Sequence, residues 1–144
     1  MNPTPNSFGI FLINEFKEIL LVLEKGYGKN LGKWGIPKGA MISSDNNDKN
    51  QCIKRKCIEE IGTNIDDIDG ELLGICSNEK YYVKTILCKK NNIFLFSKPI
   101  KVEKIKWFKL EELIEEYINN CDRYNLSIDL LINNMSKIME VISK

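Results

Sequence analysis

Residues 34–63 constrain the fold of this chain most, because a glycine-rich loop there runs directly into a helix with a charged face. Four glycines fall within residues 26–35, and Pro37, Lys38 and Gly39 close this loop. Asp48 is predicted as the N-cap of a helix that reaches about Ile61 and ends at Gly62. The segment therefore predicts a loop followed by a helix.

The predicted helix has an apolar and a charged face. Positions 56, 59 and 60 are three and four residues apart, so Lys56, Glu59 and Glu60 lie close together. We expect Glu59 and Glu60 to point outward, with the ammonium of Lys56 within ion-pair distance of one of them. The predicted inner face consists of Ile53, Cys57, Ile58 and Ile61.

Converging carboxylates on a helix are typical ligands of Mg²⁺ or Mn²⁺, which neutralise polyphosphates and activate water. Glu59 and Glu60 are candidate ligands, and the backbone of Gly39 could add one where a side chain would be too bulky. Lys56 repels such an ion by about 1 kcal/mol or more per charge. A simpler interpretation stays open, namely a solvated face with Arg55–Glu59 and Lys56–Glu60 pairs worth tenths of a kcal/mol.

Composition excludes several classes of chemistry. The chain has no histidine, which removes Ser-His and Cys-His nucleophile pairs and histidine-ligated zinc. Five cysteines without a CxxC pair favour a reducing compartment, so we expect a cytoplasmic protein. No apolar run approaches the ~18 residues that cross a bilayer, and the first residues lack the features of a signal peptide. The net charge of +1 gives no overall bias toward nucleic acid or membrane.

The order of the elements predicts one domain over residues 1–144, with a mixed sheet flanked by helices. Apolar runs predict strands at Phe8–Ile13, Ile19–Leu23, Glu71–Cys76, Tyr81–Cys88, Ile93–Phe96 and Ile105–Phe108. Helices are predicted at Glu111–Tyr117 and, as one C-terminal helix with an apolar stripe, over residues 126–143. That stripe packs on the core or forms a partner interface.

The segment 34–63 resembles the Nudix box, the motif of hydrolases that cut phosphoanhydride bonds with divalent metal. Three features depart from the pattern. The spacing from Gly39 to Arg55 is two residues longer, and Lys56 replaces a glutamate. Thr63 also replaces the usual apolar residue. The resemblance implies an α/β/α sandwich, Mg²⁺ or Mn²⁺ as cofactor, and catalytic roles for Glu59, Glu60 and Arg55. The implied metal ligands are Glu59, Glu60, Gly39 and Asp45, where Asp45 stands in place of the first glutamate of the pattern.

Within that family, residues 3–117 are similar to the Nudix domain of mRNA-decapping enzymes. The similarity rests on Pro3-Thr4, Ile19–Val22, Trp34–Gly39, Cys52, Glu59–Gly62 and Ile105–Phe108. Enzymes that split diadenosine polyphosphates share the Trp34–Gly39 pattern. Where the decapping enzymes place a further metal-site glutamate, this chain has Lys101, with Glu103 nearby.

Candidate ligand contacts follow from the resemblance and from a lysine-rich segment at residues 98–109. Trp34 is a core residue or loop anchor, or else a base-stacking ring, and Lys38 is a surface residue or a phosphate contact. The lysine-rich segment either contacts a phosphate backbone or protects a sheet edge from association. The candidate substrate- and phosphate-binding residues are Trp34, Lys38, Gly39, Lys101, Lys104 and Lys106.

These observations lead to two functional hypotheses. The first is a Nudix-fold module with impaired catalysis that binds a nucleotide, an RNA or a ribonucleoprotein such as the ribosome. The alternative is an active Mg²⁺- or Mn²⁺-dependent hydrolase of capped RNA or dinucleoside polyphosphates. Lys56 and Lys101 favour the first hypothesis, and intact Glu59 and Glu60 favour the alternative.

Overall fold

The computed structural model describes residues 7–24, 32–62, 65, 68–76, 79–86 and 102–143. The predicted strand at Ile93–Phe96 lies outside these residues. The elements are β1 (Ser7–Asn14), β2 (Glu18–Glu24), β3 (Trp34–Gly35), β4 (Lys38–Ala40), α1 (Lys49–Ile61), β5 (Glu71–Cys76), β6 (Glu79–Ile86), β7 (Val102–Lys109), α3 (Leu110–Asn119), α4 (Leu126–Asn133) and α5 (Met135–Ile142).

The strands form one mixed sheet in the order β3-β2-β1-β6-β5, with β4 paired to β1 and β7 paired to β2. β1 and β6 are parallel, whereas the other pairs are antiparallel. β2 therefore lies between β3 and β7. The sheet confirms the predicted β5–β6 hairpin and the pairing of the first two strands.

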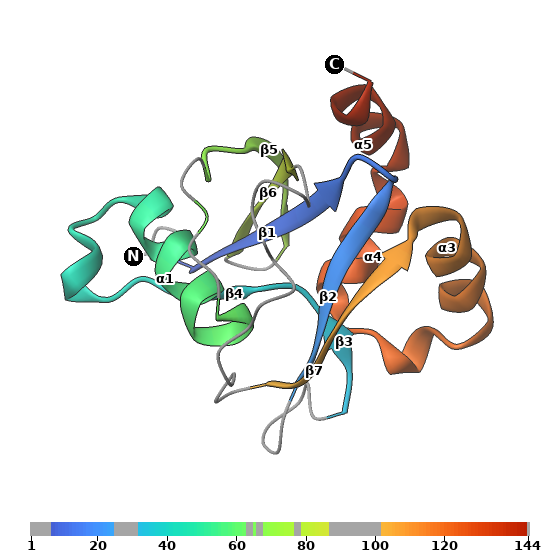
Figure 1. Ribbon diagram of the computed structural model, residues 1–144, viewed down its shortest axis with the longest axis horizontal. Coiled ribbons are helices and arrows are strands. Elements are labelled where there is room, and N and C mark those ends of the chain that lie inside the picture. Colours follow the sequence, from blue (N-terminus) through green and yellow to red (C-terminus); the bar gives the residue numbers. More distant parts are fainter. Residues whose placement is uncertain are drawn as a thin grey trace.

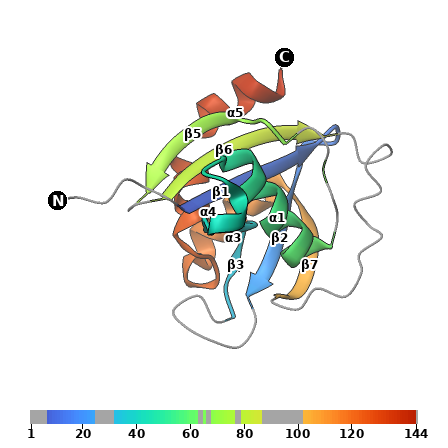
Figure 2. The ribbon, with the colours of Figure 1, turned by 90° about the vertical axis from the view of Figure 1, so that its left-hand side faces the viewer.

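Helices cover both faces of the sheet, which confirms the predicted α/β/α sandwich. In Figure 1, α1 lies on one side of the strands and α3, α4 and α5 lie on the other, and Figure 2 looks onto the α1 side. One apolar core fills the α1 side, including Ile53, Cys57 and Ile61. A second core fills the opposite side, where Leu113, Ile128 and Ile138 pack against the sheet. Within the described residues, no helix is both long enough and apolar enough to span a bilayer.

Helix α1 begins and ends where the sequence predicts. The side chain of Asp48 accepts a hydrogen bond from the backbone of Asn50, and Gly62 ends the helix in a left-handed conformation with φ of 70°. The predicted orientation of its faces is partly wrong. Ile58 is 49% exposed, whereas Glu60 is only 4% exposed. The buried stripe follows positions 52/53, 56/57 and 60/61, so Lys56 and Glu60 turn inward together.

The predicted single C-terminal helix is also wrong, because α4 and α5 are separate helices that meet at Asn134. Asn134 has φ of −123° and ψ of 30°, outside the helical region. Its side-chain amide donates a hydrogen bond to the carbonyl of Leu130. Such side-chain bonds compete with the helical backbone ladder. The apolar stripe survives the break, since Ile128, Leu131 and Ile138 are all fully buried.

Candidate functional site

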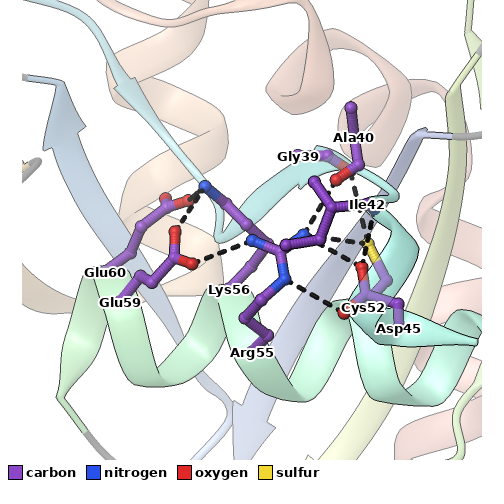
Figure 3. Close-up of polar contacts among 9 residues, drawn as sticks. All are labelled: Gly39, Ala40, Ile42, Asp45, Cys52, Arg55, Lys56, Glu59 and Glu60. Atoms are coloured by element: carbon purple, nitrogen blue, oxygen red, sulfur yellow. Dashed lines mark hydrogen bonds and ion pairs between the residues drawn. The ribbon is translucent and has the colours of Figure 1, made fainter.

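The candidate site lies where β4 and the turn after it meet the part of α1 from Cys52 to Glu60, as Figure 3 shows. Two neighbouring cations organise it. Arg55 ties the helix to the preceding turn, and Lys56 ties together the two glutamates that follow it on the helix. Because each cation bridges more than one acceptor, the charged groups hold one another in place.

Arg55 holds Asp45 through two hydrogen bonds. Its Nε donates to Oδ1 at 3.0 Å and its Nη2 donates to Oδ2 at 3.1 Å. Nη2 also donates to the carbonyl of Ala40 at 2.8 Å, and Nη1 donates to Oε2 of Glu59 at 2.8 Å. The paired planar geometry makes this one of the stronger types of ion pair in proteins. Arg55 thereby joins the turn, β4 and the helix.

Asp45 is buried and already bound within the protein. Its Oδ2 also accepts the backbone N–H of Ile42 at 2.9 Å. The hydrogen bonds from Arg55 hold the pKa of the Asp45 carboxyl below its usual range and outweigh the opposing effect of burial. The carboxylate therefore stabilises the turn before α1.

The spacing between Asp45 and Arg55 is longer than in the Nudix pattern, yet the two side chains meet. A turn separates the short helix Ser43–Asp45 from the start of α1. Asn46 and Asn47 in that turn have φ of 54° and 58°, a left-handed conformation that asparagine tolerates better than most residues. The tight turn brings Asp45 back to Arg55, and the two form an ion pair.

Lys56 contacts both glutamates. Its Nζ lies 3.2 Å from Oε1 of Glu59 and 3.2 Å from Oε2 of Glu60. The side chain of Lys56 is 11% exposed, that of Glu60 is 6% exposed, and that of Glu59 is 31% exposed. Burial lowers the pKa of Lys56, but the carboxylates of Glu60 and Glu59 outweigh it, so the net shift is upward. The predicted ion pair is confirmed, and Lys56 is a charged ammonium at neutral pH.

Gly39 provides the space in which Lys56 lies. A Cβ built on Gly39 would be 2.5 Å from Cε and 2.7 Å from Cδ of Lys56, which is closer than real atoms approach. The stem of Lys56 therefore crosses the face of this glycine on its way to the glutamates. Because Gly39 has no side chain, the stem of Lys56 can pass there. The Nudix resemblance implied a metal ligand at this position.

The donor set does not fit a divalent cation while Lys56 keeps this position. Within the described residues, no group of three or more His, Cys, Asp or Glu side chains is arranged to hold a metal ion. Asp45 is engaged by Arg55, and an ammonium lies between the carboxylates of Glu59 and Glu60. The predicted metal ligands Glu59, Glu60, Gly39 and Asp45 are thus brought close, but around two protein cations.

A shallow groove of about 360 Å³ opens beside this network on the outer side of α1. Arg55 and Glu59 line it together with Lys54, Gln51, Ser44, Asp45 and the exposed Ile58. Its lining carries two basic and two acidic residues, and Ile58 gives it an apolar portion. The outward turn of Ile58, which the sequence did not predict, contributes to this groove.

The other candidate contacts fall elsewhere. Lys38 is next to Gly39 on β4, so its side chain points to the opposite face of the sheet, and it pairs with Glu79 at 3.8 Å. Trp34, Lys104 and Lys106 share one face of the strands β3 and β7. Lys101 lies outside the described residues, as do the side chains of its neighbours 102 and 103.

Sequence reasoning missed one residue near Trp34. The ring centroid of Phe108 lies 5.0 Å from that of Trp34 in an edge-to-face arrangement, and Lys106 Nζ lies 5.0 Å from the centroid of Phe108. The signal was present in the sequence. Positions 104, 106 and 108 alternate along one strand, so they share a face of the sheet.

Comparison with known proteins gives a family. The NUDIX domain profile matches residues 3–127. No curated protein sequence matches the chain.

Solved structures match the fold at low identity. The chain is similar to the MutT protein of Methanosarcina mazei, with a TM-score of 0.63, 17% identity, and coverage of 94% of this chain and 96% of that chain. It is similar to the NUDIX domain of Shewanella oneidensis NrtR, solved with ADP ribose, with a TM-score of 0.60, 16% identity, and coverage of 96% and 90%. A bifunctional NMN adenylyltransferase/ADP ribose pyrophosphatase from Francisella tularensis, complexed with AMP and a manganese ion, matches with a TM-score of 0.57, 16% identity, and coverage of 95% and 42%.

Proposed function

The chain belongs to the Nudix domain family, and from that premise we propose that it binds a nucleotide-containing ligand while its metal-dependent hydrolysis is impaired. One observation carries this proposal: the ammonium of Lys56 lies 3.2 Å from both Glu59 and Glu60. A divalent ion at these carboxylates would meet a positive charge a few Å away, in a partly buried site where Coulomb repulsion is weakly screened. Lys56 thus balances the negative charge of Glu59 and Glu60 in place of a metal ion.

Binding of a nucleotide is supported by the fold and by the solved relatives. The Shewanella oneidensis NUDIX domain is bound to ADP ribose and the Francisella tularensis protein to AMP. In this chain, the groove beside Arg55 and Lys54 offers cations and an apolar portion at the outer face of α1. The finer sequence resemblance to mRNA-decapping enzymes makes capped RNA a second ligand to test, and a ribonucleoprotein such as the ribosome stays a proposal for the larger partner.

The test of impaired catalysis compares the wild type with Lys56→Glu. Calorimetry should detect weak Mg²⁺ or Mn²⁺ binding to the wild type and tighter binding to the variant, since Lys56→Glu adds a third carboxylate beside Glu59 and Glu60. Lys54→Glu is the matched control, because it makes the same charge change on the same helix outside this ion-pair cluster. Hydrolysis of ADP ribose, a cap analogue and a dinucleoside polyphosphate should be slow or undetectable for the wild type.

The second candidate function is an active hydrolase. One observation favours it: Arg55 donates a hydrogen bond to Glu59 at 2.8 Å, so the carboxylate of Glu59 is held in place on α1. If the wild type turns over any of these substrates robustly and Glu60→Gln abolishes that turnover, the impaired-catalysis proposal is wrong. The chain is then a metal-dependent enzyme despite Lys56.

The RNA arm of the proposal depends on the exposed lysines of β7. If Lys104 and Lys106 contact phosphates, RNA binding should weaken linearly in a log-log salt titration. Each Lys→Gln change should then reduce the slope by about one, nearly independently of sequence. The alternative, protection of a sheet edge, predicts unchanged RNA affinity and lower solubility of the double variant. That result would discard the RNA contact.

A further inference from the structure

A second surface of the protein combines aromatic rings and cations, on the face of the sheet opposite α1. β2 is paired on both sides there: Leu23 lies opposite Trp34 of β3 and opposite Lys104 of β7. Residues directly opposite one another in paired strands share a face, and alternate residues of one strand do too. Trp34, Lys104, Lys106 and Phe108 therefore lie on one face, and we call these four residues the aromatic–lysine surface.

The rings of this surface are half-buried and its lysines are exposed. Trp34 and Phe108 meet at an interplanar angle of 73°, so they do not stack on each other face to face. Lys106 places its ammonium 5.0 Å from the Phe108 centroid, within the range of a cation–π contact. Among the residues that the structure describes, no carboxylate pairs with Lys104 or Lys106. The surface therefore has positive charge beside partly exposed rings.

The surface differs from the network around Lys56 in position and chemistry. Trp107, the neighbour of Phe108, points the other way and packs against the core under α1. Trp107 of β7 and Trp34 of β3 therefore lie on opposite faces of the sheet, each packed against the core of its own face. A ligand on the aromatic–lysine surface is separated by the sheet from Glu59 and Glu60, and its binding needs no metal at those carboxylates.

We propose that the aromatic–lysine surface binds a nucleoside phosphate, with the base against Trp34 and the phosphate at Lys104 and Lys106. The inference rests on the proposed function, which it deepens by naming the ligand chemistry and the surface. A base presents a flat π-face that stacks on an aromatic ring, and a phosphate carries the negative charge that two exposed lysines attract. A ligand without the base would contact only the lysines, and a ligand without the phosphate would contact only the aromatic ring.

The fluorescence of Trp34 tests the proposal directly. The chain has two tryptophans, so Trp107→Phe leaves Trp34 as the only one. Titration of this variant with AMP should quench its fluorescence as the base covers the ring. Adenosine, which lacks the phosphate, and ribose 5-phosphate, which lacks the base, should each bind at least about fivefold more weakly than AMP. Trp34→Phe, which keeps Trp107, should show no quenching.

Surface variants provide the second measurement, because Lys106 is exposed and its change leaves the core intact. Lys106→Gln should weaken AMP binding about twofold to fivefold by calorimetry, and Lys104→Gln should do the same. Lys109→Gln is the matched control on the same strand, since Lys109 lies at its other end, opposite Glu18. That control should bind AMP like the wild type.

Two negative outcomes are distinguishable. If calorimetry detects AMP binding that neither quenches Trp34 nor changes in Lys104→Gln and Lys106→Gln, the base lies elsewhere. The surface assignment is then wrong and the proposed function stands. If neither AMP, ADP ribose nor RNA binds the folded wild type at any salt concentration, both are wrong.

Discussion

The two faces of the sheet handle charge in opposite ways. Under α1, Lys56 and Glu60 are nearly buried and form an ion pair, and the Asp45–Arg55 pair fixes the turn before the helix. On the other face, Lys104 and Lys106 are exposed beside aromatic rings. The comparison shows that charged residues which a motif brings together can pair with one another instead of facing a ligand. In this chain the charges around Lys56 and Arg55 mainly pair with one another, whereas Lys104 and Lys106 on the opposite face are exposed.

Removing the acceptor of Arg55 should have the largest effect. Asp45→Asn takes away the buried carboxylate and leaves the guanidinium without its main partner, which should lower the free energy of unfolding by about 3 kcal/mol. Asp122→Asn is the control, because Asp122 is exposed and its change should stay within about 0.5 kcal/mol. Urea denaturation followed by circular dichroism measures both. Equal stability of the two variants would contradict a structural role for Asp45.

Lys56→Met should have the next largest effect. The substitution keeps an apolar stem but leaves Glu60 buried without its cation, and should cost about 2 kcal/mol. Lys106→Met removes an exposed charge of the other face and should stay within about 0.5 kcal/mol. A double-mutant cycle with Glu60→Gln separates the pair from its surroundings, since two residues in contact are not additive. Strict additivity in that cycle would show that the 3.2 Å ion pair does not contribute.

Gly39→Ala should have a smaller effect, through displacement of Lys56. The new Cβ would lie 2.5 Å from Cε of Lys56, so the flexible stem must move and the ion pair is weakened. We expect a loss of about 1 kcal/mol in thermal or urea unfolding. In a Lys56→Ala background the same glycine change has no lysine stem to displace and should be nearly neutral. A full loss in that background would mean that Gly39 is required for another reason.

The smallest effect is the change of stability with pH near neutrality. The pKa of Asp45 is lowered in the folded protein, so its contribution is present above the unfolded value of about 4 and is lost as pH falls through the folded value. The pKa of Lys56 is raised, so its contribution is present at neutral pH and is lost only at strongly alkaline pH. Between pH 6 and pH 8 neither pair should change stability. A wild-type minus Asp45→Asn difference that is independent of pH down to pH 2 would contradict the assignment of Asp45.

The boundaries of α1 were predictable from the sequence because helix ends are set locally. Asp48 needs only a backbone N–H two residues ahead, and Gly62 needs only its own freedom to adopt positive φ. The strands on either side were predictable for a similar reason, since their apolar runs are short and bounded by polar turns. The pairing of Lys56 with the two glutamates follows from helical spacing alone.

The rotation of α1 against the sheet was not predictable from hydrophobicity. An apolar count places Ile58 inside and Glu60 outside, because it treats each residue by itself. Lys56 and Glu60 neutralise each other, so together they lose less on burial than either would alone. The helix turns that pair toward the sheet, and Ile58 lies in the groove beside Arg55.

The sequence by itself determined the family, the loop–helix unit, the mixed sheet and the presence of an ammonium among the carboxylates, since these depend on spacing and local hydrogen bonding. Only the tertiary structure decided that Asp45 belongs to Arg55, that Gly39 makes room for Lys56, and that Trp34 meets Phe108. The physical reason is the same in each case. These contacts join residues separated by ten or more positions. Packing of α1 on β4 and on the turn after it brings Lys56 to Gly39 and Arg55 to Asp45, and pairing of β3 and β7 with β2 brings Trp34 to Phe108.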